Sequence, residues 1–465
     1  MNPAGFVASV RRIVPLAWPV FIGQLAVLGF STVDTVLVAR HSSTDLAALA
    51  VGSAAFVTVF IGLMGVVLAI SPIVGQLFGA GREAEAGAQL HQAMWLALGL
   101  ALVGSTLLLF PAPFLALSQA GPEVASKIRG YLLALAFSLP ASLLFTIYRG
   151  FNTAVSRPKA VMALQIGGLA LKVPLSIALV GGVPALDVPA LGVQGCGIAT
   201  LVAMWAQVIV AWVVLRRDPF YARFALRGRG LDRPQPASLK ALLKLGVPMG
   251  LSILIEVTGF AFMAIFIARL GETPVAGHQI AANLVALLFM MPLGLANATG
   301  TLVAQRIGAA DLADACRLGR HGVLLALVVA LVVGGAVFAL RGAIVGLYTT
   351  DAAVIAAALP LVAWVTLFHA ADAVQTAAAF VLRAWHVATA PLVIYAVALW
   401  GVGLAGGYVL AFNIGGGMPA AWHGAPGFWM ASTAGLAVAA AGLSAFMGAV
   451  HRAKRREALE IASAR

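Results

Sequence analysis

The sequence predicts an all-α polytopic membrane protein with twelve transmembrane helices in two six-helix lobes. Of its 465 residues, 62% are hydrophobic and only 10% are charged, whereas about a quarter of the residues in an ordinary globular protein are charged. Apolar stretches of about 20 residues, which suffice to cross a bilayer as a helix, recur along the whole chain. The second half of the chain also repeats the first. These three observations decide the fold class.

The apolar stretches place the spans in order. The first, after Arg11 and Arg12, is too long for a signal peptide and lacks a small-residue cleavage site, so we interpret it as a spanning helix. We expect spans near 14–38, 50–76, 90–112, 128–150, 160–182, 193–215, 244–269, 277–302, 318–340, 354–382, 390–412 and 428–450.

The repeat has a constant register. Pro19 matches Pro248, Arg40 matches Arg269, and Gln76 in "VGQLFGA" matches Gln305 in "VAQRIGA". Each pair is 229 positions apart (248 − 19, 269 − 40, 305 − 76). Because each repeat has an even number of spans, we expect the lobes to share one orientation and to be related by a pseudo-two-fold axis along the membrane normal.

The formal charge of +13 comes from basic residues in alternate short loops rather than from a nucleic-acid-binding domain. By the positive-inside rule, both termini are predicted to be cytoplasmic, and we expect no nucleic-acid partner. The longest polar segment divides the chain. We expect an N-terminal lobe at 1–215, a basic cytoplasmic linker at 216–243, a C-terminal lobe at 244–450 and a basic cytoplasmic tail at 451–465.

Three acids, Asp34, Glu256 and Asp372, and one lysine, Lys172, lie well inside the predicted spans. A charge at the bilayer centre costs about 2.5–3.5 kcal/mol even on an insertion scale, so such residues usually line functional sites and pair with one another. Asp34 is the acid at comparable depth in the same half as Lys172, and we predict that the two form an ion pair. For each acid the alternative is a buried structural hydrogen bond.

Other candidate residues accompany these charges. His369 and Gln375 lie about one helical turn on either side of Asp372 and share its helix face, so His369 is either a packing residue or a proton relay. Arg149 and Arg383 are expected to snorkel at helix ends. Cys196 and Cys316 show no metal or disulfide spacing.

The sequence contains no G-x-x-x-x-G-K-[ST] loop for a nucleotide. We therefore expect no enzyme activity and no cofactor, and we expect an ion gradient to supply the energy for uphill transport.

The motifs together resemble the multidrug and toxic compound extrusion (MATE) family, in its NorM-like branch. The resemblance is carried in the first half by Pro19 with Gln24, "VDTVLVAR" (Val33–Arg40) and "PIVGQLFGAG" (Pro72–Gly81). In the second half it is carried by "KLGVPMGLSILIE" (Lys244–Glu256), "AGHQIAANL" (Ala276–Leu284), "MPLGLANATGTLVAQRIGA" (Met291–Ala309) and "DAVQTAAAFVLRA" (Asp372–Ala384).

This resemblance implies export of cationic amphiphilic drugs and dyes in exchange for H⁺ or Na⁺. It implies that Glu256 and Asp372 form the cation site of the second lobe, where they would also be the ligands of Na⁺ if sodium is the coupling ion, and that Asp34 is a further essential carboxylate. Residues expected to support the site are Lys172, His369, Gln375, Phe368, Gln24, Gln279 and Asn283. The resemblance also implies a multi-pass protein of the bacterial inner membrane, which we expect to act as a monomer.

Two departures from the family pattern bear on the ion. Lys172 and Ser176 stand where relatives often have asparagines, and Phe368 stands where they often have tyrosine. Both changes favour protons, or a sparser sodium site with backbone and water ligands.

Three rival functions are weighed against multidrug export. A lipid-linked oligosaccharide flippase of the same superfamily would be expected to need a more cationic cleft. A membrane-embedded enzyme would need a nucleophile or metal cluster at one membrane face, and a channel would not need duplicated halves.

Overall fold

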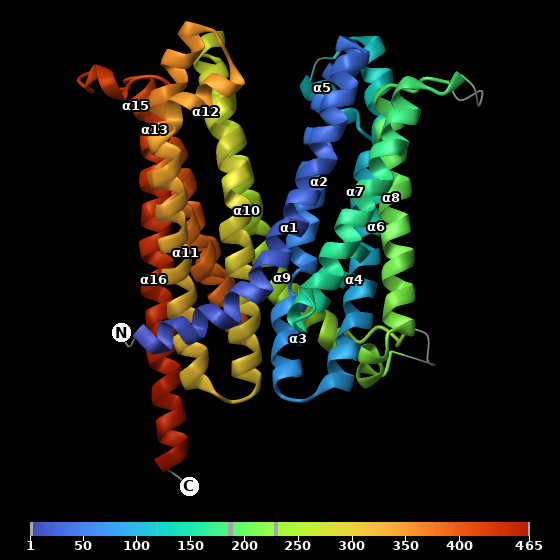
Figure 1. The fold of residues 1–465 in the computed structure, drawn as a ribbon, viewed down its shortest axis with the longest axis vertical. Coiled ribbons are helices and arrows are strands. Elements are labelled where there is room, and N and C mark those ends of the chain that lie inside the picture. The colour runs from blue at the N-terminus through green and yellow to red at the C-terminus, as the bar shows by residue number, and fades with distance from the viewer. Residues whose placement is uncertain (1–2, 119, 185–188, 227–230, 464–465) are drawn as a thin grey trace. The chain divides into compact units, whose positions relative to one another are not determined.

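The computed structural model describes residues 3–118, 120–184, 189–226 and 231–463, which form helices and no β-strand (Figure 1). Twelve helical segments in these ranges are long and apolar enough to cross a membrane. The predicted all-helical membrane fold with twelve spans is therefore confirmed. Residues 227–230 of the predicted linker and residues 464–465 of the predicted tail lie outside the described residues.

The chain forms two compact units. We call Ile22–Gly250 the first unit, and Met1–Phe21 together with Leu251–Arg465 the second unit. Both boundaries fall inside a helix, the first in α1 (Pro3–His41) and the second in α9 (Pro236–Ala268). The boundaries are 229 positions apart (251 − 22), as are the sequence repeats. The units therefore differ from the lobes expected at 1–215 and 244–450, because the first part of each of these helices packs with the other half of the sequence.

The first unit is built around α6, which packs against α2, α3, α4 and α8. Its Ser42 caps α2 by accepting a hydrogen bond from the backbone N–H of Asp45, a usual way to satisfy a helix N-terminus. The unit contains α2 (Ser43–Val67), α3 (Ile70–Gly79), α4 (Glu83–Leu109), α5 (Ala112–Ser118), α6 (Pro122–Ala154), α7 (Pro158–Gly181), α8 (Val193–Arg217) and the 3₁₀ helix η2 (Pro219–Phe224).

The described part of the predicted linker is docked on the first unit. Tyr221 and Phe224 of η2 are buried. Farther on, the carbonyl oxygen of Asp232 accepts a hydrogen bond from Trp95 Nε1 at 2.8 Å, and the carbonyl oxygen of Arg233 accepts one from Gln92 Nε2 at 2.9 Å. Backbone groups bonded in this way hold a segment in place without regular secondary structure. The linker therefore belongs to the fold of the first unit.

We expect Gly87→Ala to destabilise the protein. A Cβ atom at Gly87 would lie 1.9 Å from the carbonyl oxygen of Phe224, and this backbone atom cannot move without shifting η2. Overpacking of this kind costs about 1–3 kcal/mol. Thermal unfolding of the purified protein in detergent measures the loss. Gly99→Ala is the matched control, because Gly99 lies in the same helix and a Cβ there meets nothing within 4 Å. Equal melting temperatures for the two variants would contradict the docking of η2.

The second unit is built around α10 and α13, and its helices α10, α11, α13 and α16 pack side by side (Figure 1). Helix α16 continues through residues 451–463, so the described part of the predicted tail is helical. The unit contains α10 (Glu272–Gly308), α11 (Leu312–Ala339), α12 (Arg341–Tyr348), α13 (Ala352–Ala384), α14 (Thr389–Tyr395), the π-helix η3 (Ala396–Ala405), α15 (Gly406–Ala411), the 3₁₀ helix η4 (Ala420–Trp422) and α16 (Ala425–Ser463).

The repeat is also visible in the backbone. Helix α3 is followed by Gly81 with φ of +72°, and α10 is followed by Ala310 with φ of +57°. A left-handed residue two positions beyond the last helical residue is a common way to end a helix, and these two are 229 positions apart. The second repeat therefore keeps the turn of the first without its glycine.

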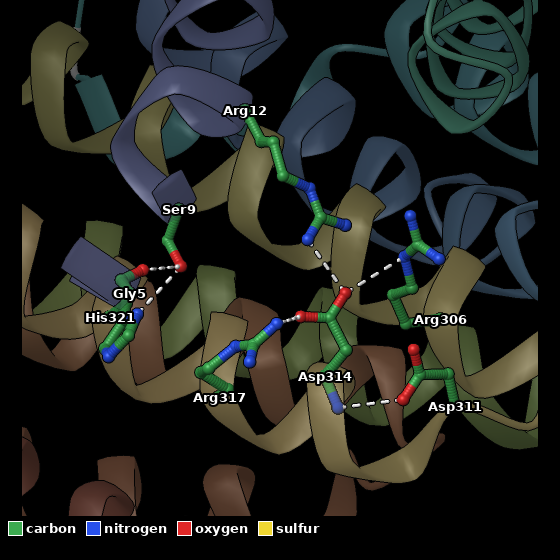
Figure 2. Close-up of polar contacts among 8 residues, drawn as sticks. All are labelled: Gly5, Ser9, Arg12, Arg306, Asp311, Asp314, Arg317 and His321. Atoms are coloured by element: carbon green, nitrogen blue, oxygen red, sulfur yellow. Dashed lines mark hydrogen bonds and ion pairs between the residues drawn. The ribbon is translucent and has the colours of Figure 1, made fainter. Parts of the chain in front are cut away.

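An ionic cluster holds the beginning of α1 on the rest of the second unit (Figure 2). Its centre is the buried Asp314 near the start of α11. This carboxylate accepts hydrogen bonds from Arg12 Nη1 at 2.8 Å and from Arg317 Nη2 at 2.6 Å, and Arg306 Nε lies 3.2 Å from Oδ2. Asp311 caps α11 through the N–H of Asp314 at 3.1 Å. Arg12 thus anchors the first turns of α1 to the second unit.

Candidate functional site

Two membrane-embedded acids of the second unit are joined through one amide. Gln375 Nε2 donates to Asp372 Oδ1 at 2.8 Å and to Glu256 Oε1 at 3.1 Å. Asp372 and Gln375 come from α13, one turn apart, and Glu256 comes from α9. Asp372 is 4% exposed and Gln375 is fully buried. The structure therefore brings together three residues singled out in the sequence, and we call them, with Tyr395, the acidic site.

Tyr395, which the sequence analysis missed, completes the acidic site. It is buried at the end of α14 and its hydroxyl donates to Gln375 Oε1, so the amide is held from both sides. Directly after Tyr395 begins the π-helix η3, whose Trp400 donates from Nε1 to the carbonyl oxygen of Ile255 at 3.0 Å. π-Helical turns are rare and are frequent at functional sites. One irregular segment thus contacts both helices that supply the acids.

Of three further side chains on α13, Arg383 differs from the expectation drawn from the sequence, whereas His369 and Phe368 do not. Arg383 does not snorkel, because its side chain is only 8% exposed and its guanidinium lies 4.7 Å from the centre of the Phe380 ring. His369 is buried and its Nε2 has no hydrogen-bond partner among the described residues. It shares no hydrogen bond with Asp372 there, which favours packing over a proton relay. Phe368 is buried against the ring of Trp429, with centroids 5.4 Å apart.

A second buried polar group lies in the first unit. Lys172 Nζ of α7 donates to Asp34 Oδ2 of α1 at 2.7 Å and to Thr200 Oγ1 of α8 at 2.8 Å. The side chains of Lys172 and Asp34 are only 2% and 7% exposed. The ammonium also lies 4.8 Å from the centre of the Phe30 ring. The ion pair predicted from the sequence is therefore present, and Thr200 is a partner that the sequence analysis did not identify.

The remaining predicted residues lie apart from both groups. Gln24 accepts a hydrogen bond from Arg149 Nη1 at 3.2 Å in the first unit. Gln279 and Asn283 are exposed on α10, and Asn283 accepts a hydrogen bond from Tyr348 at 3.1 Å. None of the three makes a hydrogen bond to the acidic site within the described ranges. Both cysteines are buried and unpaired with each other.

The chemistry open to the acidic site follows from its donors. In the ranges that the structure describes, no group of three or more His, Cys, Asp or Glu residues is arranged to hold a metal ion. A sodium ion at Glu256 and Asp372 would need further oxygen ligands, and the hydroxyl groups of Thr376 and Tyr395 are side-chain candidates, since both contact Gln375. A proton needs only a carboxylate. The two carboxylates share one neutral amide as hydrogen-bond donor. Binding of either cation would reduce the negative charge of this pair.

Comparison with known sequences gives consistent matches over almost the whole chain. A family model described as MatE matches residues 19–178 and 248–409, and its two matches begin 229 positions apart. A probable multidrug resistance protein NorM from Aromatoleum aromaticum is 41% identical over 421 residues, which cover 90% of each chain. The multidrug resistance protein PmpM from Pseudomonas aeruginosa is 34% identical over 434 residues, covering 93% of this chain and 90% of that protein.

Solved structures show the same fold at low identity. The Vibrio cholerae MATE transporter VcmN in its bent form has a TM-score of 0.84 at 19% identity, covering 97% of this chain and 98% of its own. The eukaryotic MATE transporter AtDTX14 has a TM-score of 0.84 at 18% identity, with coverage of 97% and 99%. A MOP superfamily transporter from Pyrococcus furiosus, whose binding pocket is described as of reverse polarity, has a TM-score of 0.85 at 17% identity, with coverage of 96% for both chains.

Proposed function

This chain belongs to the MatE family, and from that premise we propose that it exports cationic amphiphilic small molecules by antiport against H⁺ or Na⁺. As a member of this family it is a multi-pass membrane protein and a secondary transporter of the multidrug efflux type, not an enzyme. The antiport, the coupling ion and the chemistry of the cargo are the proposed steps.

The observation that supports this proposal is the sharing of one neutral amide by two carboxylates. Gln375 brings Glu256 and Asp372 together in a region where charge is costly. A cation arriving at this site therefore gains attraction from two acids. Because an organic cation and a small cation can both satisfy that charge, the two compete, and this competition gives exchange when the transporter changes sides only with a cation bound.

The proposed cycle uses this competition. With the acidic site open to the outside, a proton or sodium ion neutralises Glu256 and Asp372 and the organic cation leaves. After the change to the inward-facing state, the small cation dissociates and the acids attract the next organic cation. Between the two ions, the site favours the proton, because Gln375 presents its nitrogen rather than its oxygen to both acids and Phe368 supplies no hydroxyl.

The orientation and assembly are further parts of the proposal. Basic residues at 149–159, 216–240, 317–320 and 451–457 support a cytoplasmic location for both termini by the positive-inside rule. We propose that the transporter sits in the bacterial inner membrane and acts as a monomer.

A lipid-linked oligosaccharide flippase remains the alternative cargo type, since a shared fold does not fix the cargo. The charges disfavour it. The buried lysine of the first unit, Lys172, is neutralised by Asp34, whereas Glu256 and Asp372 have a neutral donor as their shared hydrogen-bond partner. Neither acid of the second unit is hydrogen-bonded to a cation in this arrangement, which suits binding of an organic cation rather than a pyrophosphate.

Transport in proteoliposomes tests the proposed function. We expect ethidium movement to be driven by an imposed proton gradient, and a sodium gradient imposed alone to reveal whether Na⁺ couples as well. Proteoliposomes that contain Asp372→Asn protein serve as the control for leakage. If ethidium moved equally with a proton gradient, with a sodium gradient and with no gradient, antiport would be contradicted. Dependence on the sodium gradient alone would overturn the preference for protons.

A further inference from the structure

The ammonium of Lys172 already occupies the position beside Asp34 that a free cation would need. It donates to Asp34 Oδ2 at 2.7 Å and to the hydroxyl of Thr200 at 2.8 Å, and the Phe30 ring lies 4.8 Å away. A carboxylate, a hydroxyl and an aromatic face are groups that bind a cation. In this first unit the cation is covalently attached to the protein.

A metal ion does not fit beside this ammonium. Lys172 is 1% exposed and Asp34 is 5% exposed, so little water is available to screen two positive charges in one site. A lysine ammonium is a compact point charge on a flexible stem, and it fills the coordination position directly. The other oxygen, Asp34 Oδ1, has no hydrogen-bond partner among the described residues, but an ion bound there would still be repelled by Lys172.

The acidic site of the second unit is built differently. Its shared donor is the neutral amide of Gln375, which does not repel an incoming cation. The repeat offset of 229, which holds in the first helices of the two halves, places Met263 opposite Asp34. The second unit therefore has no counterpart of the ion pair, and the two units treat cations in different ways.

We propose that Lys172 is a built-in cation that excludes free metal ions from Asp34, so that the first unit takes no sodium ion. This inference deepens the proposed function and rests on it for its biological meaning. It makes Lys172 a specificity-determining residue: any metal ion coupled to transport binds at the acidic site alone, whichever ion drives the cycle.

Sodium binding to the purified full-length protein in detergent tests the inference without measuring transport. Equilibrium binding of radioactive ²²Na⁺ is compared for wild type, Asp34→Asn, Lys172→Gln and the double variant. We expect Asp34→Asn to bind as much sodium as wild type. Lys172→Gln should bind sodium at an additional site, at least about a hundredfold more tightly than wild type does at Asp34. The double variant should lose this gain.

Controls separate charge from misfolding. Lys159→Gln removes an exposed lysine from the same helix α7 and should leave sodium binding unchanged. If Lys172→Gln fails to run as a single species on size exclusion, Lys172→Met replaces it. Comparison of Asp34→Asn with wild type still decides whether the wild-type protein binds sodium at Asp34.

Two results would overturn the inference: sodium binding to wild type that falls in Asp34→Asn protein shown to be folded by size exclusion, or folded Lys172 variants that gain no site. If the sodium-binding results were as expected but ethidium transport were not coupled to an ion gradient, the proposed function would be rejected. This inference about Lys172 would still hold.

Discussion

Asp372→Asn removes most of the ethidium efflux while the protein still inserts into the membrane. The substitution keeps the size of a residue that is 4% exposed but removes one of the two charges that we propose hold a cation. Coupling free energies between ligands are typically about 1–3 kcal/mol, or about 5–150-fold, and we expect a loss of transport rate in the upper part of that range. Efflux from cells or proteoliposomes, normalised to the amount of protein in the membrane, is the measurement.

The same helix supplies a matched control. Asp351 caps α13 through the N–H groups of Ala353 and Val354 and is exposed. Asp351→Asn makes the same chemical change and keeps a side chain that caps helices well, so efflux should stay near wild type. Glu256→Gln should behave as Asp372→Asn does. Full ethidium export by either acidic-site variant would show that these carboxylates do not couple transport.

Asp34→Asn is expected to cause a large loss of stability because it leaves the ammonium of Lys172 buried without a counter-charge. Breaking a buried ion pair by removing one partner typically costs about 3–5 kcal/mol. Replacing both partners by apolar residues, as in Asp34→Leu with Lys172→Met, should recover most of that loss, because no charge then remains to be desolvated. Thermal unfolding in detergent of the two single variants and the double variant gives the coupling between the residues.

An exposed ion pair is the control for this cycle. Arg82 and Glu85 form a salt bridge in which both side chains are more than half exposed, and such pairs contribute little to stability. Glu85→Gln should therefore leave the melting temperature almost unchanged. If Asp34→Asn were as stable as wild type with Lys172 present, the buried pair would not be a charged pair in the folded protein.

The fold and most of the charged residues of both sites could be predicted from the sequence for one physical reason. In a bilayer, apolar length determines where helices cross, and a charge in such a stretch must have a partner. The need for a partner is enough to pair Lys172 with Asp34, because Asp34 is the acid at comparable depth in the same half of the chain. The same need draws attention to Glu256 and Asp372 as charges in apolar stretches. Gln375 is a candidate partner because it lies one helical turn from Asp372.

The parts that the sequence did not predict depend on irregular backbone or on hydrophobic surroundings. Tyr395 and Trp400 lie in an apolar run that looks like any spanning helix, and the π-helix that directs them has no distinct composition. Arg383 lies near a helix end, where burial and snorkelling have the same sequence pattern. The linker was recognised as the longest polar segment of the chain, but its docking depends on long-range hydrogen bonds from Gln92 and Trp95.

The position of the unit boundaries has an evolutionary consequence. In each repeat, the first part of the first helix belongs to the unit formed by the other repeat. Met1–Phe21 belongs to the second unit, and the beginning of α9 up to Gly250 belongs to the first unit. A protein with a single repeat would have had no partner for this segment within its own chain. In a homodimer, two identical copies that exchanged these first segments would each have supplied a packing partner for the segment of the other. The present chain is consistent with the fusion of such a segment-swapped homodimer. The lysine of one half and the acid pair of the other are positions at which the two copies now differ.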